Sequence, residues 1–348
     1  MELINRSAAE RACAAHCYAE PARKTAKHHA HQDHLSPPPQ SIPATKMRSA
    51  PQAYRLAVFT KNRSNPAYVG ARLGADRLAE RLGCSVTHYV PEEPDAVEEQ
   101  RALLARAIDE RADAIVLAPT HATALNAVLS GLKARGIPLL CFISRPQTVE
   151  PTCFVGSDDR ELARGIADYL FDRLGPEAGV VTIEGHANAL TTAARAAGFR
   201  DAAAARAGIH IMGSRGGDFQ FDRGRSAMIA LLEAHGQIDG VLAANDVMAL
   251  GAIDVMRLRR RASPIVAINA TPDGIKAIKR GELLASAAFD AMTLSCLAVE
   301  AAVRVLRGEA VPAALTLAVE IVDRSNCEAW NLPYEARSLP QWHHYVQR

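Results

Sequence analysis

Residues 241–252 read VLAANDVMALGA and are the most informative part of this 348-residue chain. A short apolar run ends at Asn245 and Asp246, and a helix-forming sequence follows directly. This pattern predicts a strand whose carboxyl end delivers two polar side chains to the edge where open parallel sheets bind ligands. Either side chain can cap the new helix by accepting from its first free N–H groups, which leaves the other free to face a crevice.

A second strand end repeats this pattern further along the chain. Residues 265–268 are apolar, Asn269 follows them, and residues 271–274 (TPDG) open another helix. Because the carboxyl ends of parallel strands meet at one edge of a sheet, two such ends predict a small-molecule cleft.

Strands and helices alternate from Tyr54 onward, in two successive series. The first series predicts strands at 54–60, 85–90, 114–118, 137–143 and 152–155, with helices at 67–82, 95–111 and 122–135. The second predicts helices at 159–174, 191–207, 222–235, 244–257, 272–280 and 292–306, with strands at 179–183, 209–214, 240–243, 265–268, 285–289 and 315–322. We therefore expect an α/β fold of two similar lobes, each a parallel sheet flanked by helices.

The composition excludes several classes of partner. Charged residues make up 22% of the chain and leave a net charge of +2, which gives no electrostatic case for nucleic acid or an anionic membrane. No apolar run approaches the roughly 18 residues of a transmembrane helix, so no membrane insertion is expected. The 7 cysteines are scattered without a zinc pattern, and their odd number argues against a disulfide framework. We expect buried free thiols at Cys141 and Cys296 and no metal site, while a single bridge elsewhere stays open.

Residues 1–53 differ from the rest of the chain. They contain Pro37-Pro38-Pro39, several histidines and no sustained periodicity, so we expect a disordered leader or a misassigned translation start. A secretory signal needs an apolar core of about 7–15 residues, and this segment offers none as a positive sign of export.

The motifs of common catalytic and cofactor sites are missing. No G-x-G-x-x-G opens the first helix, and neither a Walker-type motif nor a G-x-S-x-G elbow occurs. His186 follows a strand and could act as a base, but no nucleophile stands at a recognisable spacing from it. We therefore expect no enzyme activity and no cofactor.

Six motifs, taken together and in order, resemble a known family. They are SNPAY (64–68), PLLCFISR (138–145), TAARAAGF (192–199), GDF (217–219), AND (244–246) and NATPDG (269–274). In these motifs the chain from Tyr54 to about Asn326 resembles the type 1 periplasmic sugar-binding proteins, in pattern like the ribose-binding proteins of bacterial ABC transporters. The resemblance implies two lobes that are joined by a three-strand hinge and close over a ligand.

The resemblance also implies the lobe boundaries. Crossings should fall near Ser157-Asp158, Phe289-Asp290 and Thr316-Leu317. Lobe one would comprise residues 54–157 and 290–316, lobe two residues 158–289 and 317–326, and a carboxyl-terminal tail residues 327–348. The aromatic residues of the tail either form a partner surface or pack on lobe two; they are Trp330, Tyr334, Trp342 and Tyr345.

Candidate ligand contacts follow from the same resemblance. Asn65 stands where the family hydrogen-bonds a ligand hydroxyl, and Tyr68 where it stacks an aromatic ring. Arg145 and Arg195 resemble arginines that donate to sugar oxygens from opposite lobes, and Phe219 resembles an aromatic wall. Plainer alternatives are turn formation for Asn65, solvated surface positions for the arginines and core packing for Phe219. At the strand end quoted first, Asn245 would contact the ligand and Asp246 would cap the helix.

The sequence departs from the family at positions that bear on the ligand. Ser144 and Asn269 stand where the family presents carboxylates, and Phe289 replaces an amide. Two arginines with fewer acids, offset in part by Asp290, predict a cleft with net positive charge. Because an unpaired buried arginine is costly, the ligand is expected to bring its own acceptors. A sugar acid, another anionic small molecule or a short polyol fits this better than a plain pentose.

The predicted function is capture of a small polar solute, which is a sugar, polyol or sugar acid, and its delivery to an ABC permease. The resemblance implies a monomer that works in the periplasm, while a cytoplasmic location stays open because no signal peptide is recognised in the sequence. A second class stays open, namely a ligand-sensing regulatory module that signals through a partner protein without catalysis.

Overall fold

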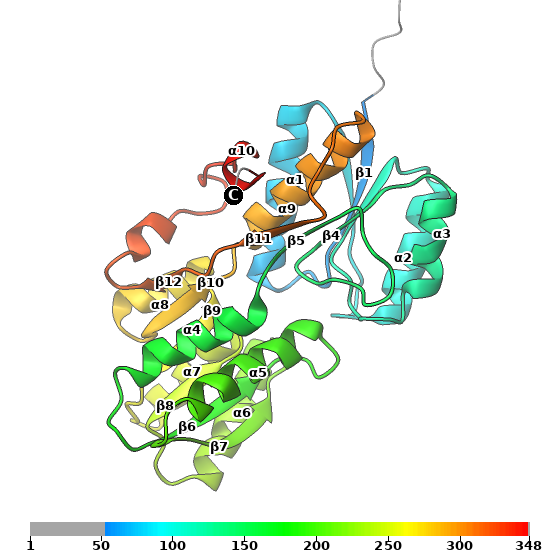
Figure 1. The fold of residues 1–348 in the computed structure, drawn as a ribbon. Coiled ribbons are helices and arrows are strands. Elements are labelled where there is room, and N and C mark those ends of the chain that lie inside the picture. Colours follow the sequence, from blue (N-terminus) through cyan, green and yellow to red (C-terminus); the bar gives the residue numbers. More distant parts are fainter. Residues whose placement is uncertain (1–52, 347–348) are drawn as a thin grey trace, which may run out of the picture. The chain divides into compact units, whose positions relative to one another are not determined.

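The computed structural model describes residues 53–346 (Figure 1). The predicted leader, residues 1–53, therefore lies outside the described residues except for Ala53. Two six-stranded sheets organise the described part. We refer to the first sheet with its helices as lobe one and to the second sheet with its helices as lobe two.

The sheet of lobe one is parallel throughout, in the order β11-β5-β4-β3-β1-β2. Its strands are β1 (Arg55–Phe59), β2 (Ser85–Tyr89), β3 (Ala114–Leu117), β4 (Leu139–Phe142), β5 (Cys153–Ser157) and β11 (Ala314–Leu317). Helices α1 (Pro66–Leu82) and α9 (Ala291–Leu306) lie on one face, and α2 (Val97–Asp109) and α3 (Asn126–Ala134) on the other (Figure 1). All of β3 and β4 is buried, as expected for parallel strands covered on both faces.

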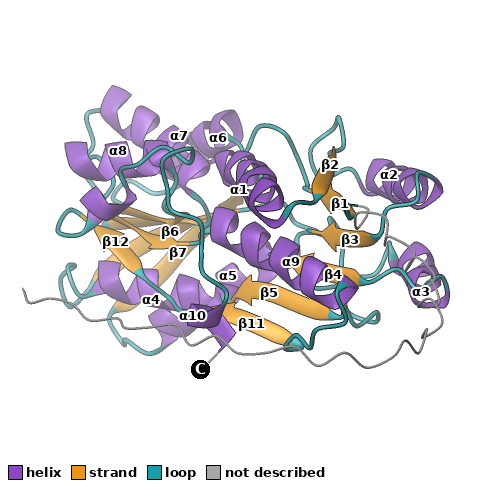
Figure 2. Ribbon diagram, turned by 90° about the horizontal axis from the view of Figure 1, so that it is seen from above, coloured by secondary structure: helices purple, strands orange, loops and turns teal. Residues whose placement is uncertain are grey.

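The sheet of lobe two has the order β12-β10-β9-β8-β6-β7 and is parallel except for β12. Its strands are β6 (Ala178–Glu184), β7 (Ile209–Gly216), β8 (Gly240–Ala243), β9 (Ile265–Asn269), β10 (Ala285–Ala288) and β12 (Ile321–Asp323). Helices α4 (Asp159–Phe171) and α5 (Leu190–Ala204) cover one face, and α6 (Phe221–Ala234), α7 (Asp246–Leu258) and α8 (Pro272–Arg280) the other (Figure 2). Two parallel sheets, each between layers of helices, confirm the predicted fold class.

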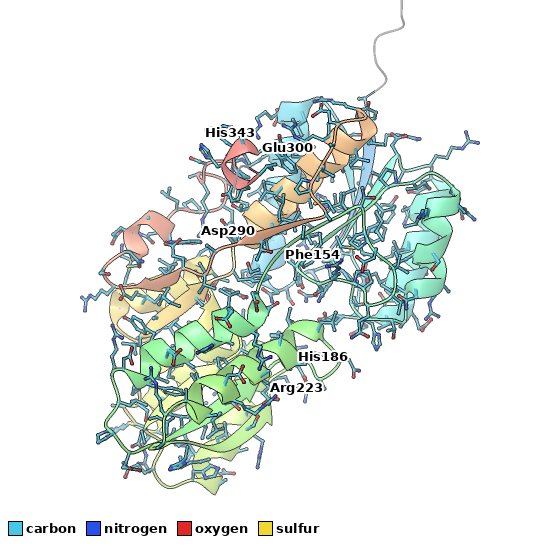
Figure 3. The ribbon with its side chains drawn as sticks, viewed as in Figure 1. Phe154, His186, Arg223, Asp290, Glu300 and His343 are labelled. Carbon is cyan, nitrogen blue, oxygen red and sulfur yellow. The ribbon has the colours of Figure 1, made fainter. Side chains whose placement is uncertain are left out.

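The chain passes between the two sheets three times. The first passage leads from β5 to α4 and the second from β10 to α9, where Asp290 lies between the lobes (Figure 3). The third leads from β11 to β12, and the predicted crossing at Thr316-Leu317 is too early because Leu317 still pairs with Ser157 in the sheet of lobe one. The chain therefore changes sheets at residues 318–320, while the division of the molecule into separately moving lobes stays a prediction.

The tail contacts both lobes. The short helix η1 (Cys327–Trp330) packs against α8 of lobe two. Further along, the Arg77 guanidinium of α1 donates to the carbonyl oxygens of Tyr334 (2.9 Å) and Arg337 (2.8 Å), and α10 (His343–Val346) ends the described chain. The expectation of a tail on lobe two is thus too narrow, because α1 belongs to lobe one.

Two further predictions concern the cysteines and membrane-spanning helices. Cys141 and Cys296 are buried free thiols, as predicted, and the 5 cysteines within residues 53–346 are all unpaired. Over the same range, no helix combines the length and the apolar character that a bilayer crossing requires.

Candidate ligand-binding site

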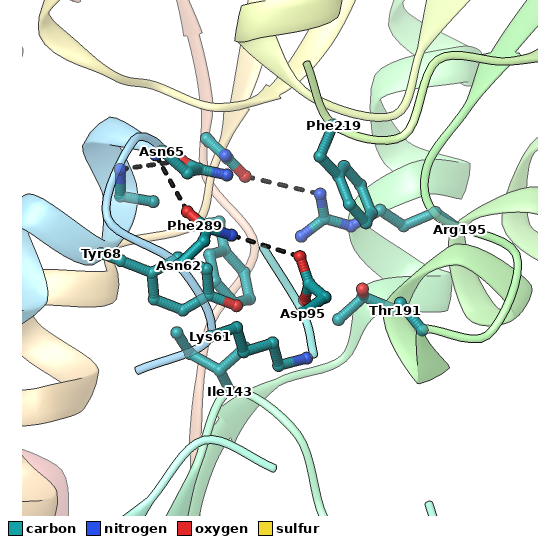
Figure 4. A pocket seen from close by; sticks show the side chains of 13 residues that line it. Lys61, Asn62, Asn65, Tyr68, Asp95, Ile143, Thr191, Arg195, Phe219 and Phe289 are labelled. Atoms are coloured by element: carbon teal, nitrogen blue, oxygen red, sulfur yellow. Dashed lines mark hydrogen bonds between the residues drawn. The ribbon is translucent and has the colours of Figure 1, made fainter. Parts of the chain in front are cut away.

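A pocket lies where the carboxyl ends of the two sheets face each other (Figure 4). Loops and helix starts of both lobes line it, and the space between them measures about 440 Å³, part of it open to solvent. The enclosed part of this space is only about 30 Å³, which is below the usual range for ligand pockets, so the lining residues lie close together in this structure. The lining residues are Lys61, Asn62, Asn65, Ala67, Tyr68, Asp95, Ile143, Ala189, Thr191, Arg195, Phe219, Asn269 and Phe289.

Six of the ten predicted site residues come together in this pocket. They are Asn65, Tyr68, Arg195, Phe219, Asn269 and Phe289. Asn65 also fills its plainer role, because its side-chain oxygen accepts from the amide of Ala67 (3.0 Å) and caps α1. The three aromatic residues supply flat apolar surfaces among the polar groups.

Arg195 is the best-anchored polar group of the pocket. Its side chain is buried, its Nε donates to Asp159 Oδ1 (2.7 Å), and its Nη1 donates to the carbonyl of Ala244 (2.5 Å). A longer bond reaches Asn269 Oδ1 (3.4 Å), and the guanidinium lies 5.0 Å from the centre of the Phe289 ring. The second terminal nitrogen, Nη2, makes no hydrogen bond within residues 53–346, so it is the donor left for a ligand.

Lys61 is a pocket residue that the sequence analysis missed. It follows β1, only 3% of its surface is exposed, and its Nζ donates to Ser144 Oγ (2.8 Å). No carboxylate of the described residues lies within 4.0 Å of this ammonium group, and burial lowers the pKa of Lys61 against the opposing charge of Asp95. An ammonium group has three donors, so Lys61 retains hydrogen-bonding capacity for a ligand. The feature of the sequence that could have identified Lys61 as a site residue was its position just after an apolar strand.

Asp95 and Asn62 were missed as well. Asp95 lies in the loop between β2 and α2, and its backbone amide donates to the carbonyl of Lys61 (2.9 Å). Asn62 Nδ2 donates to Asp95 Oδ2 (3.3 Å), which holds the carboxylate at the pocket wall (Figure 4). An acceptor therefore stands beside the Lys61 donor in lobe one. The acidic loop gave little signal, because a run of acids before a helix is usually solvated.

Backbone strain gathers at the same place. Of the 8 non-glycine residues with positive φ in the described part, 4 line the pocket: Asp95 (61°), Ile143 (68°), Phe219 (61°) and Asn269 (133°). Such conformations cost energy and cluster at ligand sites, where the surrounding structure holds them. This concentration is independent support for the pocket as the functional site.

Ser144 and Arg145 do not line the pocket. Ser144 is buried behind it as the acceptor for Lys61. The Arg145 side chain is 44% exposed, pairs with Glu150 and lies over the Phe154 ring. The backbone leaves the strand direction at Ile143, so that Ile143 itself faces the pocket and Arg145 takes the plainer surface role.

Asn245, and not Asp246 as predicted, caps α7, and neither residue lines the pocket. Asn245 is fully buried, caps α7 by accepting from the amide of Met248 (2.9 Å), and donates to the carbonyl of Phe219 (3.4 Å). It therefore supports the aromatic wall instead of lining the pocket. Asp246 accepts from the amide (2.6 Å) and hydroxyl (2.8 Å) of Thr271 and from the Ser286 hydroxyl (2.6 Å). Burial raises the pKa of Asp246 to about 6.

Asp290 also lies outside the pocket lining. Its carboxylate caps α9 by accepting from the amide (3.1 Å) and the hydroxyl (2.7 Å) of Thr293. The residue therefore fixes the start of the helix that follows the second passage between lobes. It does not offset charge within the pocket.

The expectation of a net positive cleft is wrong. Lys61 and Asp95 line the pocket from lobe one, and Arg195 lines it from lobe two with its charge paired by Asp159, which lies outside the lining. Burial raises the pKa of Asp159, and the Arg195 charge opposes that rise. The arginine charge that was expected to lack a partner is thus balanced, and Arg145 adds nothing. Within residues 53–346 no group of His, Cys, Asp and Glu is arranged to hold a metal ion.

Comparison with known proteins agrees with this architecture. The family model for the periplasmic binding protein domain matches residues 56–310. A D-ribose/D-allose-binding protein of Pseudomonas aeruginosa is 30% identical over 275 residues, which cover 74% of this chain and 84% of that protein. A ribose import binding protein of Bacillus subtilis is 26% identical over 277 residues, which cover 80% of this chain and 89% of that protein.

A solved structure shows the same relationship. It is an ABC transporter solute binding protein from Mycobacterium smegmatis with bound glycerol, 26% identical, with a TM-score of 0.75. The similarity covers 80% of this chain and 96% of that one. The chain therefore belongs to the type 1 periplasmic binding protein family, which includes the ribose-binding proteins.

Proposed function

We propose that this protein binds a neutral monosaccharide or polyol in the pocket between its lobes and delivers it to the permease of an ABC importer. The observation that carries the proposal is the pairing of ligand-facing donors across the pocket, Lys61 from lobe one and Arg195 from lobe two. A polyhydroxylated molecule offers acceptors to both at once, so it gains contacts in the closed arrangement that neither lobe provides alone.

The charge balance supports a neutral ligand over a sugar acid. Because Arg195 is already paired with Asp159, the protein does not need an anion to neutralise it. A carboxylate in the ligand would also meet Asp95 at the pocket wall, and like charges at close range oppose binding. The relatives point the same way, since their names and contents are ribose, allose and glycerol.

The pocket residues offer a ligand three kinds of contact: hydrogen-bond donors, hydrogen-bond acceptors and aromatic faces. Lys61, Asn62 and Asp95 offer donors and an acceptor for hydroxyls on one side of the ligand. Arg195 and Asn269 do so on the other side, and the rings of Tyr68, Phe219 and Phe289 cover the C–H faces of a sugar. No step of this scheme makes or breaks a bond, so the protein acts by binding alone.

Import is favoured over the alternative of a sensory module. Two of the relatives are named or described as components of import systems, and both match this chain over most of their own length. The scheme further places the protein in the periplasm as a monomer that meets its permease in the closed, loaded state.

A thermal-shift screen tests the proposal. The purified protein is heated with neutral pentoses and hexoses, with polyols, and with the matching sugar acids. Neutral sugars or polyols are expected to raise the melting temperature, because a ligand that binds only the folded state stabilises it. Stabilisation by sugar acids alone would contradict the neutral-ligand argument. No stabilisation by any of the three classes would contradict the function.

A further inference from the structure

The carboxyl-terminal residues 327–346 form a link between the lobes in addition to the three passages. We call this segment the strap. Its first part is fixed to lobe two: Glu328 Oε1 pairs with Lys279 Nζ of α8 (2.8 Å), and Trp330 Nε1 donates to Glu320 Oε1 beside β12 (3.0 Å). Cys327 is buried at the same place.

The middle of the strap is fixed to α1 of lobe one. Arg77 holds the carbonyls of Tyr334 and Arg337, and Arg81 donates to the carbonyl of Pro340 (3.2 Å). The Tyr334 ring lies against the backbone of Gly70, where an added Cβ would come within 2.6 Å of the ring. Glycine at this position therefore lets the strap approach the helix closely.

The end of the strap is fixed to α9 of lobe one. Trp342 is buried, and the Arg304 guanidinium lies 4.9 Å from the centre of its indole. Arg304 is oriented in turn by Glu300 of α9 (3.0 Å), and Glu300 and the strap residue His343 appear in the same region of lobe one (Figure 3). The strap thus has two separate attachments on lobe one.

Arg337 forms hydrogen bonds within the strap, between the parts of the strap that contact lobe two and lobe one. Its Nη2 donates to the carbonyl of Trp330 (2.9 Å) and its Nε to that of Leu332 (3.0 Å). The guanidinium also lies 4.7 Å from the centre of the Tyr334 ring. The segment from the lobe-two attachment at Trp330 to the lobe-one attachment at Tyr334 is therefore short and internally bonded.

We propose that the strap limits the separation of the lobes and favours the closed cleft. Residues 331–333 alone separate the two attachments, and the four Cα–Cα steps from Trp330 to Tyr334 reach at most about 14 Å when fully extended. A rotation that moves α8 far from α1 must therefore break the strap's contacts with α1, made by Arg77, Arg81 and Gly70, or its contacts with lobe two, made by Lys279 and Glu320. Contacts made in one arrangement and lost in the other shift the equilibrium toward the first. This inference rests on the proposed closure of the lobes over a ligand.

The test compares two strap variants with a matched control. Arg77→Ala/Arg81→Ala releases the strap from α1 and keeps the whole chain, and a truncation after Trp330 removes the strap beyond lobe two. Arg164→Ala is the control, because within residues 53–346 this exposed arginine of α4 forms ion pairs with Glu161 and Asp168 alone, away from both strap and pocket. Small-angle X-ray scattering without ligand measures the radius of gyration, and calorimetry measures the affinity for the sugar or polyol found in the screen.

Both strap variants are expected to show a larger radius of gyration than the wild type without ligand. They are also expected to bind about ten-fold more weakly, which is the order expected from losing one or two charge-assisted hydrogen bonds that favour closure. The control should match the wild type in both. An unchanged or smaller radius of gyration in the double variant would overturn the proposal. The scattering requires no ligand, so a failure of the wild type to bind any sugar would contradict the proposed function alone.

Discussion

Replacing Asp246 by asparagine should change how the stability of the protein depends on pH. The Asp246 carboxylate is fully buried and accepts three hydrogen bonds, from Thr271 and Ser286. Ser286 Oγ also accepts from the amide of Ala270 (3.0 Å), next to the strained backbone of Asn269. This network therefore supports one wall of the ligand pocket.

The magnitude follows from the pKa of Asp246, which burial raises from an ordinary value of 3.8 to about 6. Between these two values the folded protein binds more protons at this site than the unfolded chain does. The free energy of unfolding must then fall as the pH rises from 3.8 to 6, and the site contributes no further change above pH 7. A shift of about two pKa units corresponds to about 3 kcal/mol, as an order of magnitude.

Urea unfolding of the wild type and of Asp246→Asn at pH 4, 5, 6 and 7.5 measures this contribution. All other titrating groups are common to both proteins, so the difference between their free energies of unfolding isolates the site. The wild type is expected to lose about 2.4 kcal/mol of the full ~3 kcal/mol relative to the variant between pH 4 and 7.5, because pH 4 already lies above the unfolded pKa of 3.8. A difference that stays constant over this range would refute the argument, because it would mean that Asp246 is ionised throughout.

Three further substitutions test separate parts of the account. Arg145→Ala should leave ligand affinity within two-fold of the wild type in calorimetry, because the side chain is exposed and paired with Glu150; a large loss would return Arg145 to the site. Lys61→Met should weaken binding at least ten-fold, the order of one charge-assisted bond, and an unchanged affinity would exclude Lys61 as a ligand contact. Gly198→Ala should lower the free energy of unfolding by about 1–3 kcal/mol in urea, because the added Cβ would lie 2.2 Å from the carbonyl oxygen of Arg160 in the adjacent helix α4. An unchanged free energy of unfolding would show that the two helices can separate freely.

The two-lobed fold could be predicted from the sequence because it depends on local patterns. Apolar runs such as residues 265–268 have the length and flanking residues of buried strands, and the stretches between them have helical periodicity. Strict alternation of the two leaves few arrangements other than parallel sheets with helices on both faces. The third passage was misplaced by a few residues, because nothing in the sequence marks the point where one extended segment leaves one sheet and joins another.

The site residues could be predicted only where the position of a residue along its strand or helix also fixes the direction of its side chain. Asn269 and Arg195 meet in the pocket because Asn269 ends β9 and Arg195 lies in the second turn of α5, and the fold determines the orientation of both elements. Arg145 was misplaced because Ile143 adopts a left-handed backbone that redirects the chain, and such a local reversal has no clear sequence signal at isoleucine. Lys61 and Asp95 were missed because they reach the same pocket from two different loops, which a backbone hydrogen bond from Asp95 to Lys61 holds together.

The sequence also could not show which of two neighbouring polar residues caps α7. Asn245 and Asp246 can both cap a helix, and the pattern does not say which one does. The outcome depends on Thr271 and Ser286, whose hydroxyls and amide surround Asp246 and not Asn245. Thr271 precedes α8 as its N-cap, and Ser286 lies within β10, so both partners come from other elements of lobe two.

Titration calorimetry of the stabilising sugar or polyol into the wild type and into Arg195→Lys tests the central claim most directly. Lysine keeps a positive charge beside Asp159, so the fold should persist, but it lacks the planar fork that reaches Asp159, Ala244 and a ligand together. The account predicts one binding site per chain in the wild type and an affinity about 10–100-fold weaker in the variant. Equal affinity in the two proteins would contradict a binding site in the cleft between the lobes.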